Sequence, residues 1–154
     1  MSSRVSDIRF AGWIGLLVNL ILAAAKLVAG MLGHSQAVVA DAVHSLSDTV
    51  TDVALILGVR YWSAPADERH PHGHRRFETL ITVFIGLMVA AAAVGIGWDA
   101  IASFGRPSHP PSIIALVVSL LSIGTKEALY RWSVKVGRAT GSSALVANAW
   151  HHRT

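Results

Sequence analysis

Four ionisable side chains recur at helical spacing within one predominantly apolar stretch of the sequence. They are Asp41, His44, Asp48 and Asp52, which lie three, four and four residues apart. In a helix this spacing places all four along one face. A His and an Asp one turn apart can bind the same metal ion, which makes His44 and Asp48 a candidate ligand pair. Asp41 and Asp52 share the face, and we predict that they either bind the ion as well or line its access route.

The end of the sequence supplies a second candidate ligand. His151 and its neighbour His152 follow a short apolar segment. If that segment and the stretch around His44 form antiparallel helices in a membrane, His44 and His151 each lie about 15 Å from a membrane face. Both imidazoles then reach the middle of the bilayer. Each candidate also has an interpretation without metal. His44 and Asp48 form a buried ion pair or satisfy polar neighbours, and the two adjacent histidines, which point in different directions, serve different neighbours.

The composition places these residues in a membrane protein. The chain has 154 residues, of which 53% are hydrophobic and 14% charged, with a formal net charge of +4, and its mean hydropathy is +0.51. Soluble domains carry roughly 25% charged residues, so a soluble enzyme, a nucleic-acid-binding protein and a disordered chain are all disfavoured. The sequence contains no cysteine, which excludes disulfides and thiolate metal sites from this chain. Any metal must be held by His, Asp, Glu or backbone oxygen.

Apolar stretches of about 20 residues predict membrane-spanning helices. Four stretches are long enough, at about residues 12–32, 35–62, 79–98 and 111–132. A fifth covers residues 141–154, and its helical length of about 21 Å is too short to cross the hydrocarbon layer. We therefore predict an all-α fold: a polytopic transmembrane helix bundle with four full spanning helices and the start of a fifth.

Lysine and arginine are unevenly distributed, which predicts the orientation in the membrane. They concentrate before the first span and in the connections after the second and fourth spans, namely at Arg4, Arg9, Arg60, Arg69, Arg75, Arg76, Arg131, Lys135 and Arg138. These parts, including the N-terminus, are predicted to be cytoplasmic in a multi-pass protein of the cell membrane. Lys26 and Lys126 fall within predicted spans, and we expect their side chains to extend toward the interfaces. Asn19 is expected either to hydrogen-bond across helices or to lie near the pathway.

The sequence resembles cation diffusion facilitators, a family of divalent-metal/proton antiporters. The segment ADAVHSLSDTVTD resembles the metal-binding signature of the family's second helix, and PADERHPHGHRRFETL resembles its cytoplasmic loop. The segments ALYRW and SSALVANAWHHRT resemble the end of the fourth helix and the start of the fifth. Members have six membrane helices, form dimers and usually end in a cytoplasmic metal-sensing domain. The resemblance thus implies that residues 1–154 are a cation-efflux transmembrane domain lacking the rest of helix 5, helix 6 and the C-terminal domain.

The resemblance also implies a transport site. In the family it combines two residues four apart on the second helix with two residues four apart on the fifth. The first pair falls on His44 and Asp48 and the third position on His151, whereas the fourth position would follow Thr154.

A short loop after the second span holds a further cluster of candidate ligands, namely Asp67, His70, His72 and His74. Several histidines beside a carboxylate are typical of metal sites. By resemblance, Asp67, His70 and His74 match a second, lower-affinity site of some family members, and His72 is an additional candidate. The alternative is a solvated loop whose arginines contact anionic lipid headgroups.

These features predict a secondary transporter that exports a divalent transition metal from the cytoplasm in exchange for protons. Zn²⁺ ranks first because it accepts tetrahedral imidazole and carboxylate ligands, and Fe²⁺, Co²⁺, Cd²⁺, Ni²⁺ and Mn²⁺ stay open. The expected partners are the metal ion, the lipid bilayer and a second copy of the chain, but no nucleic acid. The alternatives are a non-transporting metal-binding or scaffold fragment and a membrane enzyme, for which the sequence offers no organised substrate motif.

Overall fold

The computed structural model describes residues 3–65, 70–71, 73–102, 104 and 112–153, and these residues form helices without any strand. The helices are α1 (Ser3–Leu32), α2 (Gln36–Trp62), α3 (Arg76–Ala102), α4 (Ile113–Thr140) and α5 (Ser143–Arg153). Four segments are long and apolar enough to cross a membrane, namely Ser3–Leu32, Gln36–Trp62, Arg76–Asp99 and Ile113–Thr140. The predicted all-α transmembrane bundle, with four spanning helices and a shorter fifth, is confirmed.

The long helices extend beyond the apolar runs that predicted them. Helix α1 begins at Ser3 rather than near residue 12, and α4 ends at Thr140 rather than near residue 132. The hydrocarbon layer sets the length of the apolar run but not the length of the helix, which continues into the interface as polar turns. Helix α4 stops at Gly141, whose φ of 61° is left-handed and whose backbone N–H donates to the carbonyl oxygen of Arg138. Because α5 starts at Ser143, α4 and α5 form a tight helical hairpin.

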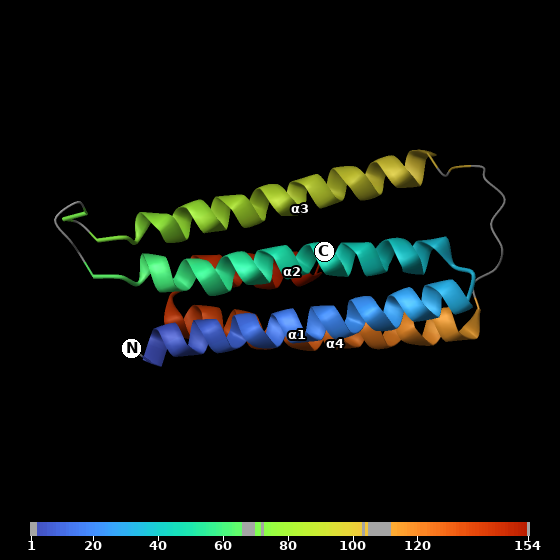
Figure 1. Ribbon diagram of the computed structural model, residues 1–154, viewed down its shortest axis with the longest axis horizontal. Coiled ribbons are helices and arrows are strands. Elements are labelled where there is room, and N and C mark those ends of the chain that lie inside the picture. The colour runs from blue at the N-terminus through green and yellow to red at the C-terminus, as the bar shows by residue number, and fades with distance from the viewer. Residues whose placement is uncertain (1–2, 66–69, 72, 103, 105–111, 154) are drawn as a thin grey trace.

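Helices α1 and α2 form an antiparallel pair, α4 runs beside α1, and α3 lies along the outer side of α2 (Figure 1). Helix α5 contacts α2, α3 and α4, and its last residues reach the middle of α2. The apolar core lies at the end of the bundle where α1 begins, and consists of Val5, Ile8, Ala11, Leu55, Val59, Trp62, Ala144 and Leu145. This core fixes the first turn of α5 against α1 and α2. It thereby sets the rotation and depth of the residues that follow in α5.

Helix α3 differs from the other spans because little of it is buried. Leu87, Val94 and Trp98 are 64%, 73% and 71% exposed in the single chain. A helix that is apolar on all sides, with so little of its surface covered by the rest of its own chain, is suited to contact lipid or another membrane helix. The polar residues of the bundle are therefore concentrated between α1, α2, α4 and α5.

Candidate metal centre

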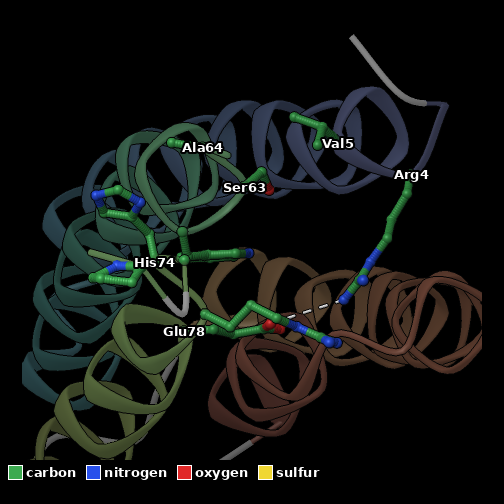
Figure 2. Close-up of a pocket in the computed structure, with 10 residues that line it drawn as sticks. Arg4, Val5, Ser63, Ala64, His74 and Glu78 are labelled. Atoms are coloured by element: carbon green, nitrogen blue, oxygen red, sulfur yellow. Dashed lines mark ion pairs between the residues drawn. The ribbon is translucent and has the colours of Figure 1, made fainter. Parts of the chain in front are cut away.

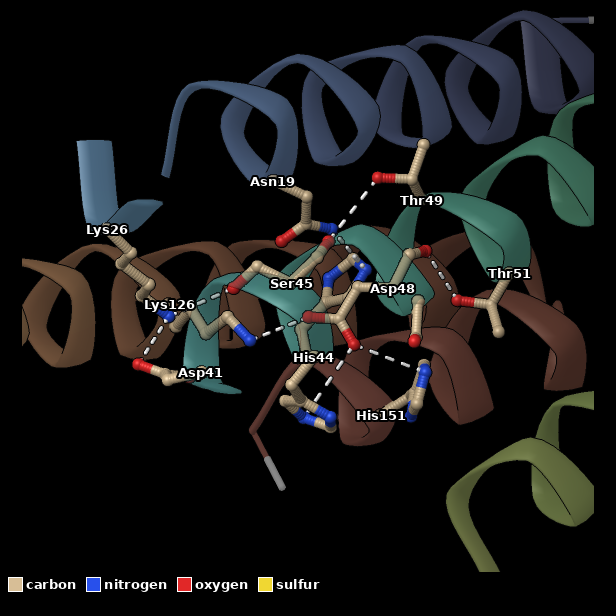
Figure 3. Close-up of polar contacts among 12 residues, drawn as sticks. Asn19, Lys26, Asp41, His44, Ser45, Asp48, Thr49, Thr51, Lys126 and His151 are labelled. Atoms are coloured by element: carbon tan, nitrogen blue, oxygen red, sulfur yellow. Dashed lines mark hydrogen bonds and ion pairs between the residues drawn. The ribbon is translucent and has the colours of Figure 1, made fainter. Parts of the chain in front are cut away.

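Asp48 lies at the centre of a buried polar cluster between α2, α4 and α5 (Figure 3). Its Oδ1 is 3.2 Å from His151 Nε2 and 3.9 Å from His44 Nε2. Its Oδ2 is 2.6 Å from the Nζ atom of Lys126. Asp48 and His151 are both fully buried, and the His44 side chain is 13% exposed. Three helices thus direct two imidazoles and an ammonium group toward one carboxylate.

This arrangement brings together the three residues that the sequence singled out, His44, Asp48 and His151. Their relative depth is as expected from antiparallel helices, and the rings of His44 and His151 lie 6.1 Å apart at an interplanar angle of 76°. As the side chains stand, no three His, Asp or Glu residues of the described segments are arranged to hold a metal ion. The ammonium group of Lys126 occupies one oxygen of Asp48. The other oxygen, Oδ1, faces His44 and His151, so only a metal ion that binds both oxygens of Asp48 must displace this ammonium group.

Both intramembrane lysines contradict the expectation that they extend toward the interfaces. Lys26 is 1% exposed, and its Nζ lies 2.8 Å from Asp41 Oδ2 and donates to Ser45 Oγ at 2.9 Å. Lys126, whose side chain is 12% exposed, reaches Asp48 instead. Each lysine pairs with a carboxylate at its own depth on a neighbouring helix. Its charge is then compensated within the low-dielectric environment, so the side chain need not extend to the interface. The matched depths of each lysine and its aspartate were the signal available in the sequence.

A cavity of about 280 Å³ leads to the Asp48 cluster. Its lining includes His44 and Lys126 as well as Asp41 and Lys26. The Asp41 side chain is 41% exposed and therefore faces the cavity rather than the interior of the cluster. Of the two roles predicted for Asp41, its position fits the lining of an access route.

Asp52 lies one helical turn from Asp48 and has entirely different partners. Asn19 Nδ2 donates to its Oδ2 at 2.8 Å, and Asn148 Nδ2 donates to its Oδ1 at 2.7 Å. His152 Nε2 lies 3.0 Å from Oδ1. All four side chains are at most 1% exposed. The expectation that Asn19 hydrogen-bonds across helices is confirmed.

Neither Asn148 nor a partner for His152 was predicted from the sequence. A signal was present, because Asn148 and His152 lie four residues apart in α5, as Asp48 and Asp52 do in α2. This spacing places Asn148 and His152 on one face of α5, from which both side chains can reach one residue of the adjacent helix. The two adjacent histidines do point in different directions: His151 faces Asp48 and His152 faces Asp52.

Of the four candidate ligands in the loop, the structure describes two, His70 and His74, and Asp67 and His72 lie outside the described residues. The two described imidazole rings are 4.3 Å apart, and His74 is buried. Close to them is a cavity of about 470 Å³, which His74, Arg4 and Glu78 line (Figure 2). The loop histidines are thus adjacent, as a shared ligand role requires.

Comparison with known proteins identifies the family. The family model described as the cation efflux transmembrane domain matches residues 12–154. The manganese efflux system protein MneP of Bacillus subtilis is 36% identical over 152 residues, which are 99% of this chain and 51% of that protein. Metal tolerance protein C1 of Arabidopsis thaliana is 38% identical over 159 residues, covering 92% of this chain and 33% of the relative.

The magnetosome protein MamM of Paramagnetospirillum magneticum is 36% identical over 151 residues, covering 94% of this chain and 46% of the relative. The chain spans about half the length of MneP and MamM. No solved structure matches the chain. The family model covers all but the first residues, and the relatives align over nearly the whole sequence, in agreement with the resemblance noted above. The chain therefore belongs to the cation efflux family and carries that family's transmembrane domain.

Proposed function

We propose that the chain forms the transport site of a membrane protein that exports a divalent transition metal, Zn²⁺ foremost, from the cytoplasm in exchange for protons. The observation that carries the proposal is the burial of His44 and His151 around Asp48 in a bundle of the cation efflux family. Two imidazoles and a carboxylate are three of the four ligands that a tetrahedral zinc site needs. The proposed ligands are His44, Asp48 and His151.

Lys126 gives the site a charge-neutral state without metal. Its ammonium group lies 2.6 Å from Asp48 Oδ2 and compensates the buried carboxylate. An incoming divalent ion exchanges with this ammonium group, which then turns into the adjoining cavity that Lys126 already lines. The exchange keeps a cation next to Asp48 throughout the cycle, so no step leaves the carboxylate uncompensated within the membrane.

Protons drive the cycle by competing with the metal. An imidazole binds metal only when it is neutral, so protonation of His44 or His151 on the outward side releases the ion. A gradient of one pH unit supplies about 1.4 kcal/mol per proton. Alternating access of one site to the two sides of the membrane then converts the proton gradient into metal export.

Mn²⁺ is the second candidate metal. The observation in its favour is that a relative aligned over 99% of this chain is named as a manganese efflux system protein. Oxygen-rich sites favour Mn²⁺, whereas a site with two imidazoles favours Zn²⁺. Fe²⁺, Co²⁺, Cd²⁺ and Ni²⁺ accept the same ligand types, so competition between metals in a transport assay is the deciding measurement.

The orientation and the homodimer are part of the same proposal. The start of α1, the end of α2, the start of α3 and the end of α4 lie at one end of the bundle, and this end carries Arg4, Arg75 and Arg138. The concentration of arginines supports a cytoplasmic position for this end and for the N-terminus. The exposed apolar surface of α3 leaves room for a second copy of the chain.

The experiment measures transport by the full-length protein in liposomes with an imposed pH gradient. We expect Asp48→Ala and His151→Ala each to abolish proton-driven Zn²⁺ transport. Ser47→Ala should retain it, because that hydroxyl donates to the carbonyl oxygen of Val43 on another face of α2. If both ligand variants transported like the wild type, the site assignment would be wrong. A wild-type protein that binds Zn²⁺ but does not move it would favour the scaffold alternative.

A further inference from the structure

A second group of buried polar side chains, which we name the amide cage, surrounds the carboxylate of Asp52. It consists of Asp52, His152, Asn19 and Asn148, from α2, α5, α1 and α5. The cage lies about 6 Å along α2 from Asp48, toward the end of the bundle where α1 begins. His152 also lines the 280 Å³ cavity that reaches His44 and Lys126. The cage is thus connected to the cavity but is distinct from the Asp48 cluster.

Asp52 differs from the other two aspartates of α2 in how its negative charge is compensated. Asp41 and Asp48 each have a lysine within 2.8 Å. Within the described segments, Asp52 has no lysine or arginine in ion-pair distance, and its partners are two amides and an imidazole. An ionised carboxylate that is fully buried in a membrane bundle requires a compensating cation. With a neutral imidazole at His152, the cage therefore has a charge deficit that an added cation would remove.

The hydrogen bonds of the cage conflict at one atom. His152 Nε2 lies 3.0 Å from Asp52 Oδ1, to which it would have to donate. The same nitrogen lies 3.1 Å from Asn19 Nδ2 and 3.4 Å from Asn148 Nδ2, from which it would have to accept. One ring nitrogen cannot donate and accept at once. The present arrangement therefore leaves at least one close contact unsatisfied.

The conflict would disappear if both amides rotated and a cation were bound between the side chains of the cage. The Oδ1 atoms of Asn19 and Asn148 are buried and have no hydrogen-bond partner among the described residues. Turning each amide by 180° exchanges its nitrogen for its oxygen at the same place. The carboxylate of Asp52, both amide oxygens and His152 Nε2 then direct lone pairs at a common centre. Separations of about 3 Å between such atoms are those of ligands around one small divalent ion.

Gly15 of α1 provides the space for the cage. A Cβ atom at this position would lie 2.8 Å from Asp52 Oδ1 and 3.1 Å from His152 Cε1. Gly15 precedes Asn19 by one helical turn, so the same face of α1 provides both the space and a ligand. Any side chain larger than hydrogen would push against two members of the cage.

We propose that the amide cage is a second binding site for a divalent transition metal. Three oxygens and one imidazole nitrogen suit a harder ion, such as Mn²⁺ or Fe²⁺, better than the ligands of the Asp48 cluster do. The cage would hold its ion one helical turn from Asp48, beside the cavity that His152 lines. A role of this ion in export rests on the proposed function, but the binding of metal at Asp52 does not.

The test counts Mn²⁺ bound to the full-length protein in detergent, by equilibrium dialysis combined with electron paramagnetic resonance. Asp52→Asn keeps the side-chain size and removes its charge, and we expect it to lower the count by one ion per chain. Zn²⁺ binding to Asp48→Asn, measured in parallel by equilibrium dialysis, is expected to fall by one ion per chain while its Mn²⁺ count at the cage stays unchanged. An unchanged Mn²⁺ count and affinity in Asp52→Asn would overturn the amide cage as a metal site. An unchanged Zn²⁺ count in Asp48→Asn would overturn the transport-site assignment and leave the cage standing.

A second variant separates loss of metal from loss of folding. Gly15→Ala leaves all four ligands in place, and alanine is a better helix former than glycine. We expect it to weaken binding of the ion that Asp52→Asn removes by at least about tenfold, a change of 1.4 kcal/mol. The matched control is Gly86→Ala in α3, where an added Cβ has no neighbour within 4 Å. If Gly15→Ala bound Mn²⁺ as Gly86→Ala does, the cage would be structural and the proposal wrong.

Discussion

Asp48 and Asp52 are two carboxylates of one helix face, separated by one turn and equally buried, yet their surroundings are opposite in kind. Asp48 has a lysine at 2.6 Å and two imidazoles nearby. Asp52 has two amide donors, at 2.8 and 2.7 Å, and one imidazole. The first carboxylate lies beside a full positive charge and the second beside amide dipoles and an imidazole. A shared face therefore does not imply a shared role, because the neighbouring helices decide how each charge is compensated.

The difference arises from which helices pack against each level of α2. Helix α4 supplies Lys126 at the level of Asp48, whereas α1 supplies Asn19 at the level of Asp52. Helix α5 contributes to both levels through the adjacent residues His151 and His152. Removing the charge of Asp48 should therefore have different consequences from removing the charge of Asp52, and the following variants measure the difference.

The largest expected effect is on stability. Asp48→Asn leaves the ammonium group of Lys126 without its carboxylate, and we expect the free energy of unfolding to fall by about 3 kcal/mol. Asp52→Asn should lower it by only about 1 kcal/mol, because a third amide can still bond to Asn19 and Asn148. Denaturant unfolding in detergent measures both. The double variant Asp48→Asn/Lys126→Met should recover at least half of the loss. Equal losses at the two positions would remove the distinction between them.

The next effect concerns metal affinity at Asp48. Lys126→Met removes a positive charge beside Asp48 that opposes an incoming metal ion, so we expect Zn²⁺ to bind about tenfold more tightly, by about 1.4 kcal/mol. Calorimetric titration of the full-length protein measures this. Lys26→Met is the control, since Lys26 pairs with Asp41 and should leave the affinity at Asp48 nearly unchanged. Weaker Zn²⁺ binding in Lys126→Met would show that the lysine shapes the site instead of competing for it.

A smaller effect is expected at Asp41, the third carboxylate of the face. Asp41→Asn should lower the free energy of unfolding by about 1 kcal/mol, because Lys26 keeps its hydrogen bond to Ser45 and the Asp41 side chain is 41% exposed. The same denaturant titration that compares Asp48 with Asp52 measures this loss. A loss as large as that of Asp48→Asn would mean that the Asp41 pair is as poorly hydrated as the Asp48 pair.

The smallest effect on transport is expected from the loop. The double variant His70→Ala/His74→Ala removes the two adjacent loop imidazoles but changes no residue between the spanning helices. We expect it to lower the amount of bound Zn²⁺ and to leave the rate of Zn²⁺ transport within about twofold, a difference of about 0.4 kcal/mol. Calorimetry and the liposome assay check the two parts. Unchanged zinc stoichiometry would reject a loop site, and abolished transport would make the loop part of the pathway.

Much of the architecture was predictable because it depends on local periodicity and length. The apolar runs predicted four spans, and the antiparallel order of the helices predicted that His44 and His151 reach one depth. Helix ends were predicted less well, since α4 continues to Thr140 as far as the left-handed Gly141. The polar turns beyond the hydrocarbon layer lack the apolar residues from which the spans were predicted. Their extent depends on capping and on contacts such as that between Ser142 and Glu78.

The sequence by itself determined that Asp41, His44, Asp48 and Asp52 share a face, because helical spacing is a property of the backbone alone. Only the tertiary structure decided that Lys26 and Lys126 turn inward, and that His151 and His152 serve different carboxylates. These choices depend on the rotation and depth of one helix against another. The core around Trp62 and Leu145 sets both for α5, and no periodicity within a single helix encodes them.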